Sequence, residues 1–183
     1  MSLAWWILGI LLIIVIIFAY YYNRFAVLKN RIDNSLSQID VQLKRRADLI
    51  PNLIETVKGF AKHESAAIKA VTDARKALVS AKGVVDKVKA DNQLESALKT
   101  IFAIAEGYPD LKANTNFVEL QRELSSTEDK VAYARQYYND SILTYNNLST
   151  TMPGAFFAKL YGKKEREYLK ITEAEKKPVN VKF

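Results

Sequence analysis

The fold is decided by residues Leu3–Phe60, which read LAWWILGILLIIVIIFAYYYNRFAVLKNRIDNSLSQIDVQLKRRADLIPNLIETVKGF. The stretch begins as an uninterrupted apolar segment and continues as an amphipathic one. Between Gly9 and Pro51 it contains neither Gly nor Pro, the residues that interrupt helices most strongly. We therefore predict one very long helix, which anchors the chain in a membrane and is continuous with the first helix of a soluble domain.

Leu3–Tyr22 has the length and composition of a transmembrane helix. Its 20 residues carry no charged side chain and would span about 30 Å, the thickness of the hydrocarbon core. A signal peptide needs a basic start and a small-residue cleavage site, which this segment lacks, so we expect an uncleaved anchor. We expect the following residues at the membrane interface: Trp5, Trp6, Tyr20, Tyr21, Tyr22, Arg24, Lys29, Arg31, Phe156 and Phe157.

The charge distribution predicts the orientation in the membrane. The net charge is +7, and the two most basic segments, residues 23–46 and 153–183, carry +4 each. Because basic residues follow the span and none precedes it, the positive-inside rule places the N-terminus outside and the C-terminal domain in the cytoplasm. An anionic inner leaflet explains both basic segments without a nucleic-acid partner.

Beyond the anchor, the pattern is typical of an all-α, antiparallel up-down four-helix bundle. Apolar residues repeat every seven positions along the two long segments that end at Phe60 and Thr150. Shorter helical patterns lie between them, joined by short connections that favour antiparallel neighbours. We expect bundle helices at residues 23–60, 67–81, 92–105 and 114–150, in a chain divided into an anchor (1–22), a bundle (23–152) and a C-terminal segment (153–183).

Arg46 occupies a position on the apolar ladder of the first helix where an apolar side chain is expected. A buried arginine needs a carboxylate partner. If the first and fourth helices run antiparallel with Phe60 near Phe117, Arg46 lies near Glu128 or Asp129. We therefore predict an interior Arg46–Glu128 ion pair, and the same register sets Asp40 near Arg135.

The sequence allows two interpretations of the C-terminal segment. Ala155–Arg166 combines bulky apolar residues with a basic cluster, which suits a short helix at the membrane interface. The alternative is a helix that caps the end of the bundle. From Glu167 onward we expect an irregular tail, either disordered or held at Val179, Val181 and Phe183.

The sequence lacks the residue sets of common active sites. There is no Cys, and His63 is the single His, so we expect no cofactor, no metal and no enzymatic activity. The His63-Glu64 pair suits a helix junction better than acid-base catalysis. Asp33, Asp40 and Asp48 suit solvation or ion pairing better than metal binding. The Tyr138-Asn139 and Tyr145-Asn146 repeat favours structural hydrogen bonding over a ligand surface.

Several stretches together resemble the bacterial LemA family. They are QIDVQLKRRADLIPNL (38–53), VKGFAKHE (57–64), YPDLKANTNFVELQREL (108–124) and RQYYND (135–140). The resemblance covers nearly the whole chain after the anchor. It implies a single-span protein of the bacterial inner membrane with a cytoplasmic helical bundle, and it supplies no catalytic activity.

These observations lead to a functional expectation. We expect a non-enzymatic, membrane-anchored scaffold or adaptor, and the length of the exposed helix favours a homo-oligomer. The alternative is a regulatory partner of another inner-membrane protein, such as a protease or a signalling receptor. In either case the expected partners are the lipid bilayer and another membrane protein or a second copy of the chain.

Overall fold

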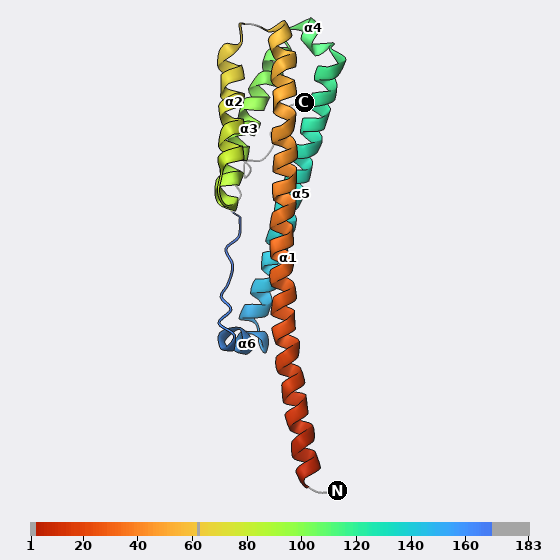
Figure 1. Cartoon of the computed structure of the whole chain (residues 1–183), viewed down its shortest axis with the longest axis vertical. Helices are drawn as coiled ribbons and strands as arrows, with labels where there is room; N and C mark the ends of the chain where they lie inside the picture. Colours follow the sequence, from red (N-terminus) through yellow and green to blue (C-terminus); the bar gives the residue numbers. More distant parts are fainter. Residues whose placement is uncertain (1–2, 62, 170–183) are drawn as a thin grey trace, which may run out of the picture. The chain divides into compact units, whose positions relative to one another are not determined.

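The computed structural model describes residues 3–61 and 63–169, and helices dominate this part of the chain (Figure 1). No strand occurs among these residues, so the all-α prediction is confirmed. The helices of the described residues are α1 (Leu3–Phe60), α2 (Ser65–Ser80), α3 (Val84–Ala105), α4 (Pro109–Lys112), α5 (Thr115–Thr150) and α6 (Gly154–Leu160).

Helix α1 confirms the prediction of one long helix. It continues through Pro51 and ends at Phe60. The ladder residues Phe25, Ile32 and Ile39 are buried, whereas the large apolar side chains from Leu3 to Phe18 are exposed. One helix thus combines an uncovered apolar segment with a segment that packs against the rest of the protein.

The chain folds into two compact units. Among the described residues, one is formed by those from 36 to 135 and the other by those up to Ser35 together with those from Gln136 to Leu169. Both α1 and α5 contribute residues to each unit. The first unit is called the 36–135 unit below, and the second is called the terminal unit.

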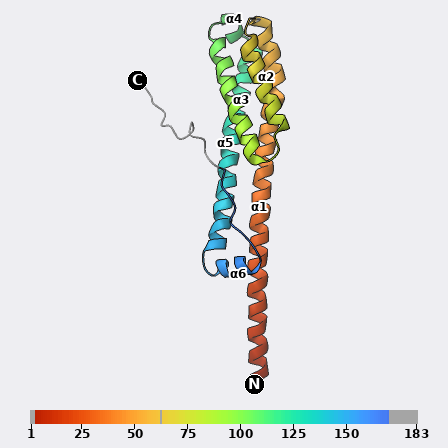
Figure 2. The same cartoon turned by 90° about the vertical axis from the view of Figure 1, so that its left-hand side faces the viewer.

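In the 36–135 unit, α2 and α3 lie side by side (Figure 2). Helix α2 buries the stripe Ile68, Val71, Ala74 and Leu78. The connection to α3 contains Gly83, whose φ of 87° lies in the left-handed region that glycine adopts without a steric penalty. This glycine permits the reversal between the two helices.

The predicted start of the third helix near Asn92 is wrong. Helix α3 begins at Val84, directly after Gly83, and Asn92 lies well inside it. The Asn92/Glu95 spacing imitates a capping box. The earlier residues Val84–Asp91 nevertheless continue the same helical stripe, since Val88, Asp91, Leu94 and Leu98 are all buried.

The described residues contain helices beyond the four expected in the bundle, because the Pro109–Lys112 segment forms its own turn, α4. Helix α5 begins close to the predicted residue, and Asn114 caps it. The side chain of Asn114 accepts a hydrogen bond from the Phe117 backbone N–H at 3.1 Å. An oxygen that satisfies this otherwise free donor stabilises the helix start.

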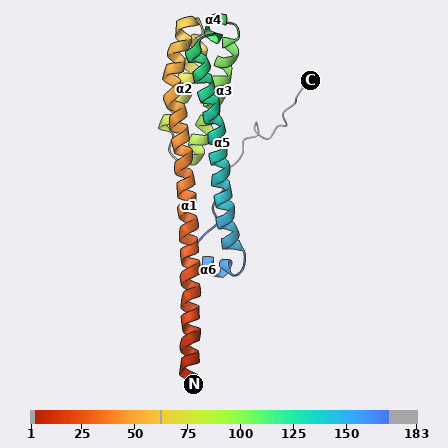
Figure 3. The ribbon, with the colours of Figure 1, turned by 90° about the vertical axis from the view of Figure 1, so that its right-hand side faces the viewer.

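In the terminal unit, α6 packs against α1 and the end of α5 (Figure 3). Gly154, the first residue of α6, makes a close approach to α5: a Cβ there would lie 2.1 Å from the Leu148 carbonyl oxygen. Only glycine therefore fits. The buried core of this unit comprises Phe25, Leu28, Ile32, Ile142, Tyr145, Phe157 and Ala158.

Candidate functional site

The N-terminal part of α1 is long and apolar enough to cross a membrane. It is the one such helix in the described part of the chain, and no residue in its most apolar stretch is buried by the rest of the protein. The tryptophans expected at the interface, Trp5 and Trp6, are 68% and 66% exposed. A run of uncovered apolar side chains of this length is unfavourable in water, so it suggests membrane anchoring.

An aromatic cluster joins α6 to α1 where the apolar segment ends. The Phe157 ring stacks on Tyr21, with centroids 4.3 Å apart and planes at 8°, and meets Phe18 edge-on at 5.2 Å. The Tyr161 hydroxyl donates a hydrogen bond to the Phe18 carbonyl oxygen at 2.8 Å. These contacts hold α6 at the level of the last turns of the apolar segment.

The expected interface residues divide between this cluster and the surface. Phe157 is buried at 6% exposure and is occupied by contacts within the protein, whereas Phe156 beside it is 56% exposed. Tyr20 and Tyr22 are exposed, and Tyr21 is half-buried. Arg24, Lys29 and Arg31 are exposed as well, and Arg31 donates a hydrogen bond through Nε to the Tyr137 hydroxyl at 3.2 Å.

Two asparagines of α5 fix the segment that follows α6. The side chain of Asn146 donates to the Arg166 carbonyl oxygen at 2.9 Å and accepts from the Arg166 N–H at 2.8 Å. Asn139 makes the same pair of bonds with Leu169, at 3.1 and 2.9 Å. The seven-residue spacing places both amides on one face of the helix. The structural role expected for this repeat is therefore confirmed, while Val179, Val181 and Phe183 lie outside the described residues.

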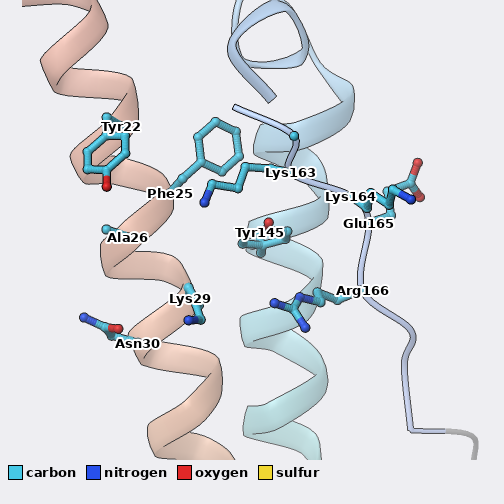
Figure 4. Close-up of a pocket in the computed structure, with 11 residues that line it drawn as sticks. Tyr22, Phe25, Ala26, Lys29, Asn30, Tyr145, Lys163, Lys164, Glu165 and Arg166 are labelled. Carbon is cyan, nitrogen blue, oxygen red and sulfur yellow. The ribbon is translucent and has the colours of Figure 1, made fainter. Parts of the chain in front are cut away.

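A basic cleft of about 550 Å³ lies between α1 and this fixed segment (Figure 4). Phe25 and Tyr145 contribute to its apolar lining. In the close-up, Lys163 and Arg166 point from the C-terminal segment across the cleft, and Glu165 points away from it. The Arg166 guanidinium carbon lies 6.0 Å from the centre of the Tyr145 ring, a cation–π distance. The charged residues around the cleft are Lys29, Lys163, Lys164, Glu165 and Arg166.

In the 36–135 unit, Arg46 is the centre of a buried ionic cluster. Its side chain is 2% exposed, and its Nη2 lies 3.5 Å from the carboxylate of Glu128, the partner expected from the register. The Glu128 side chain is 44% exposed, so this contact lies at the edge of the interior and not inside it. The shorter contact of Arg46 is with Asp91, at 2.9 Å from Nη1, and the Asp91 side chain is also 2% exposed. The Arg46 side chain thus joins α1 to both α3 and α5.

Burial dominates the electrostatics of this cluster. Desolvation raises the pKa of Asp91 above its usual value, although the guanidinium of Arg46 and the charge of Arg135 oppose the increase. The pKa of Glu128 is raised as well, first by burial and then by the neighbouring charge of Glu95. Both carboxyl groups therefore hold a proton more readily than they would in water.

The second expected ion pair, between Asp40 and Arg135, stays a prediction. The Asp40 carboxylate accepts a hydrogen bond from Lys87 at 2.7 Å, and Arg135 is close enough to Asp91 to lower its pKa. Lys87 and Asp91 both lie in the first part of α3. A helix predicted to begin at Asn92 excludes Lys87, the partner of Asp40, and Asp91, the nearest partner of Arg46. The apolar residues around Asp91 indicated that the helix begins earlier.

The remaining residues considered for catalysis or metal binding lie at a helix junction or on the surface. His63 is exposed in the turn between α1 and α2, and the Glu64 carboxylate accepts a hydrogen bond from the Tyr108 hydroxyl at 2.9 Å. Asp48 pairs with Lys44 four residues earlier. Within residues 3–61 and 63–169, no three His, Asp or Glu side chains gather as a metal site would require.

The sequence of this chain is similar to the sequences of known proteins. Residues 35–183 match the sequence model of the LemA family. The magnetosome protein MamQ of Magnetospirillum gryphiswaldense is 26% identical, over 86% of this chain and 68% of that protein. The magnetosome protein MamQ 2 of Paramagnetospirillum magneticum is 24% identical over the same shares. Protein LemA of Metamycoplasma hominis is 28% identical over 65% of this chain and 55% of its own length.

Proposed function

The chain belongs to the LemA family, and on that premise we propose that it is a non-enzymatic scaffold or adaptor anchored in the bacterial inner membrane. The observation that carries the proposal is the dual character of α1. Its apolar part is uncovered, and its later residues supply buried positions such as Phe25 and Leu43 to the packed units. The anchor is therefore part of the helix on which the rest of the protein is built.

The proposed topology is a single pass with the N-terminus outside and the remainder in the cytoplasm. The exposed residues Arg24, Lys29 and Arg31 directly follow the apolar segment, which supports this orientation by the positive-inside rule. Within the 36–135 unit, we propose that α2, α3 and the adjoining parts of α1 and α5 make up the expected antiparallel bundle. The Arg46 contacts with Asp91 and Glu128 support this arrangement.

The non-enzymatic assignment is supported by the character of the sites. The buried charges of the 36–135 unit are engaged with one another, and the basic cleft of the terminal unit presents ammonium and guanidinium groups, which suit binding. None of the three relatives described above has a name that denotes an enzyme, and two are named magnetosome proteins. A protein that organises a membrane-bound assembly fits these features. The alternative is a regulatory partner of another inner-membrane protein.

Site-directed photocrosslinking in intact cells tests the proposal. A photoreactive amino acid at Val118 of α5, which is 49% exposed, samples the surface, and the same substitution at the buried Val131 of that helix is the matched control. A scaffold that self-assembles gives crosslinks between copies at Val118 and none at Val131. One recurring foreign membrane protein at Val118 favours the regulatory alternative. Absence of crosslinks at Val118 and at the exposed Val79 of α2 would contradict both.

A further inference from the structure

The basic cleft of the terminal unit begins where the apolar segment of α1 ends. Tyr22, the last residue of that segment, lines the cleft, and so does Lys29. Seven helical residues separate the two, a rise of about 10 Å. The polar headgroup region occupies roughly 5–8 Å on each side of the hydrocarbon core. If Leu3–Tyr22 crosses the membrane, the cleft therefore opens at headgroup depth.

The charge of the cleft suits a phosphate group. Four cations line it, Lys29, Lys163, Lys164 and Arg166, against the single carboxylate of Glu165. None of the four forms an ion pair with a carboxylate elsewhere in the described residues. Lysine and arginine are the side chains that bind phosphate most strongly, and arginine does so with two parallel hydrogen bonds.

The cleft is also held in position by the fold. The hydrogen bonds of Asn146 fix both backbone groups of Arg166. The opposite wall belongs to α1, where Phe25 is 1% exposed and packs edge-on against Tyr145. Because its walls are preorganised, a ligand would lose little binding free energy to ordering them.

We propose that this cleft binds the phosphate of an anionic phospholipid headgroup, an inference that rests on the proposed membrane anchoring. The exposed ring of Tyr22 and the side chain of Ala26 continue the lining toward the apolar segment, so an acyl chain can follow α1 while its phosphate meets Lys163 and Arg166. A soluble phosphate compound would use the same cations but not this apolar edge. The bound lipid would connect the C-terminal segment, α1 and the bilayer at one point.

The test measures lipid binding to the full-length protein in neutral detergent, with phosphatidylglycerol added and bound lipid counted by native mass spectrometry. We expect one tightly bound phosphatidylglycerol per chain, and weaker binding of zwitterionic phosphatidylcholine. Each basic residue near lipid contributes about fivefold in affinity, so the double variant K163Q/R166Q should bind roughly 25-fold more weakly. The hydrogen bonds that fix Arg166 use its backbone, so the segment stays in place in this variant.

The matched control is the double variant R24Q/K159Q. It removes the same charge from exposed residues of α1 and α6 that do not line the cleft. Near wild-type affinity in this control supports a defined site, whereas equal losses in both variants would reduce the effect to diffuse surface charge and overturn the proposal. Displacement of the lipid by equimolar glycerol phosphate would assign the cleft to a soluble ligand instead.

A separate readout distinguishes failure of this inference from failure of membrane anchoring. Membranes from cells that produce the protein are washed with alkaline carbonate, which releases peripheral proteins. A protein that stays in the membrane but binds no phosphatidylglycerol contradicts the lipid site alone. Release of the protein by the wash would contradict the proposed anchoring.

Discussion

Arg46 and Asp91 bury opposite charges beside each other. The pair is 2.9 Å apart, and each side chain is 2% exposed. A buried pair of this kind contributes little net stability, because desolvation offsets most of the attraction, yet loss of one partner leaves the other charge uncompensated. We therefore expect the cluster to determine which helices pack together more than it adds to the free energy of unfolding.

Substitution of Arg46 by Met should destabilise the protein by about 3–5 kcal/mol at neutral pH, because it leaves Asp91 buried without its closest cation. Chemical unfolding followed by circular dichroism in detergent measures the change. The neighbouring variant R45M is the control: Arg45 pairs with Glu123 at the surface, where both side chains are about half exposed. Its cost should stay below about 1 kcal/mol. Equal losses in the two variants would contradict the proposed importance of the buried cluster.

The raised pKa of Asp91 predicts an unusual pH dependence. A carboxyl group whose folded-state pKa is raised binds a proton more tightly when folded, so its contribution to stability is greatest below the unfolded value and is lost as pH rises through the folded pKa. The variant D91N imitates the protonated group. The stability of D91N relative to wild type should therefore increase as pH rises from the ordinary value of 3.8 through the folded pKa.

Unfolding of both proteins over a pH series measures this difference. Other carboxyl groups titrate in the same range, but their effect is common to wild type and variant and cancels in the comparison. If wild type instead gained stability relative to D91N with rising pH, the attraction of Arg46 would outweigh burial and the pKa of Asp91 would be lowered.

At the scale of elements, the segment after α6 is held by side chains and not by a regular structure of its own. Asn139 and Asn146 each satisfy one backbone N–H and one carbonyl of this segment. Each amide therefore pairs with both polar backbone groups of one residue, as a neighbouring strand does in a sheet. The position of the basic cleft depends on these four hydrogen bonds.

Replacement of Asn146 by Ala should release the Arg166 N–H, which then exchanges with solvent more rapidly. Two lost hydrogen bonds correspond to about 2 kcal/mol, or roughly a 30-fold faster exchange. Hydrogen–deuterium exchange of the peptide that contains Arg166 measures the effect. Asn147→Ala changes the exposed neighbouring asparagine and should leave the exchange unchanged. Unchanged exchange in N146A would show that the segment is held by other contacts.

The elements were predictable to the extent that their residues follow one period. Helix α1 and the end of α5 follow from long seven-residue ladders, and the burial of Arg46 follows from its place on one of them. The start of α3 did not follow, because Asn92 and Glu95 satisfy the local pattern of a cap while tertiary packing continues the helix back to Val84. Local capping signals carry no information about what covers the residues before them.

The site was less predictable, because its contacts join residues far apart in the sequence. The Tyr-Asn repeat indicated hydrogen bonding, but its partners at Arg166 and Leu169 lie in a segment without any period. Phe157 was expected at the membrane interface, and the stacking on Tyr21 that buries it depends on the close turn at Gly154. In the sequence, the residues that form these contacts cannot be distinguished from ordinary aromatic or polar surface residues.

In the molecule as a whole, α1 is the element that links the features described above. The helix supplies uncovered apolar residues first, then the wall of the basic cleft, and then Arg46. The proposed membrane anchor, the proposed lipid site and the buried cluster therefore lie on successive parts of one element. We propose that its apolar part crosses the membrane with the rest of the chain inside the cell.

Cysteine accessibility tests this topology, since the sequence contains no cysteine and every introduced thiol is unique. The variants are S2C, before the apolar segment, and V79C, at a position of α2 that is 66% exposed. A maleimide that cannot cross the inner membrane is added to intact cells and then to lysed cells. We predict that S2C is labelled in intact cells and that V79C is labelled only after lysis. Labelling of V79C in intact cells would contradict the proposed topology.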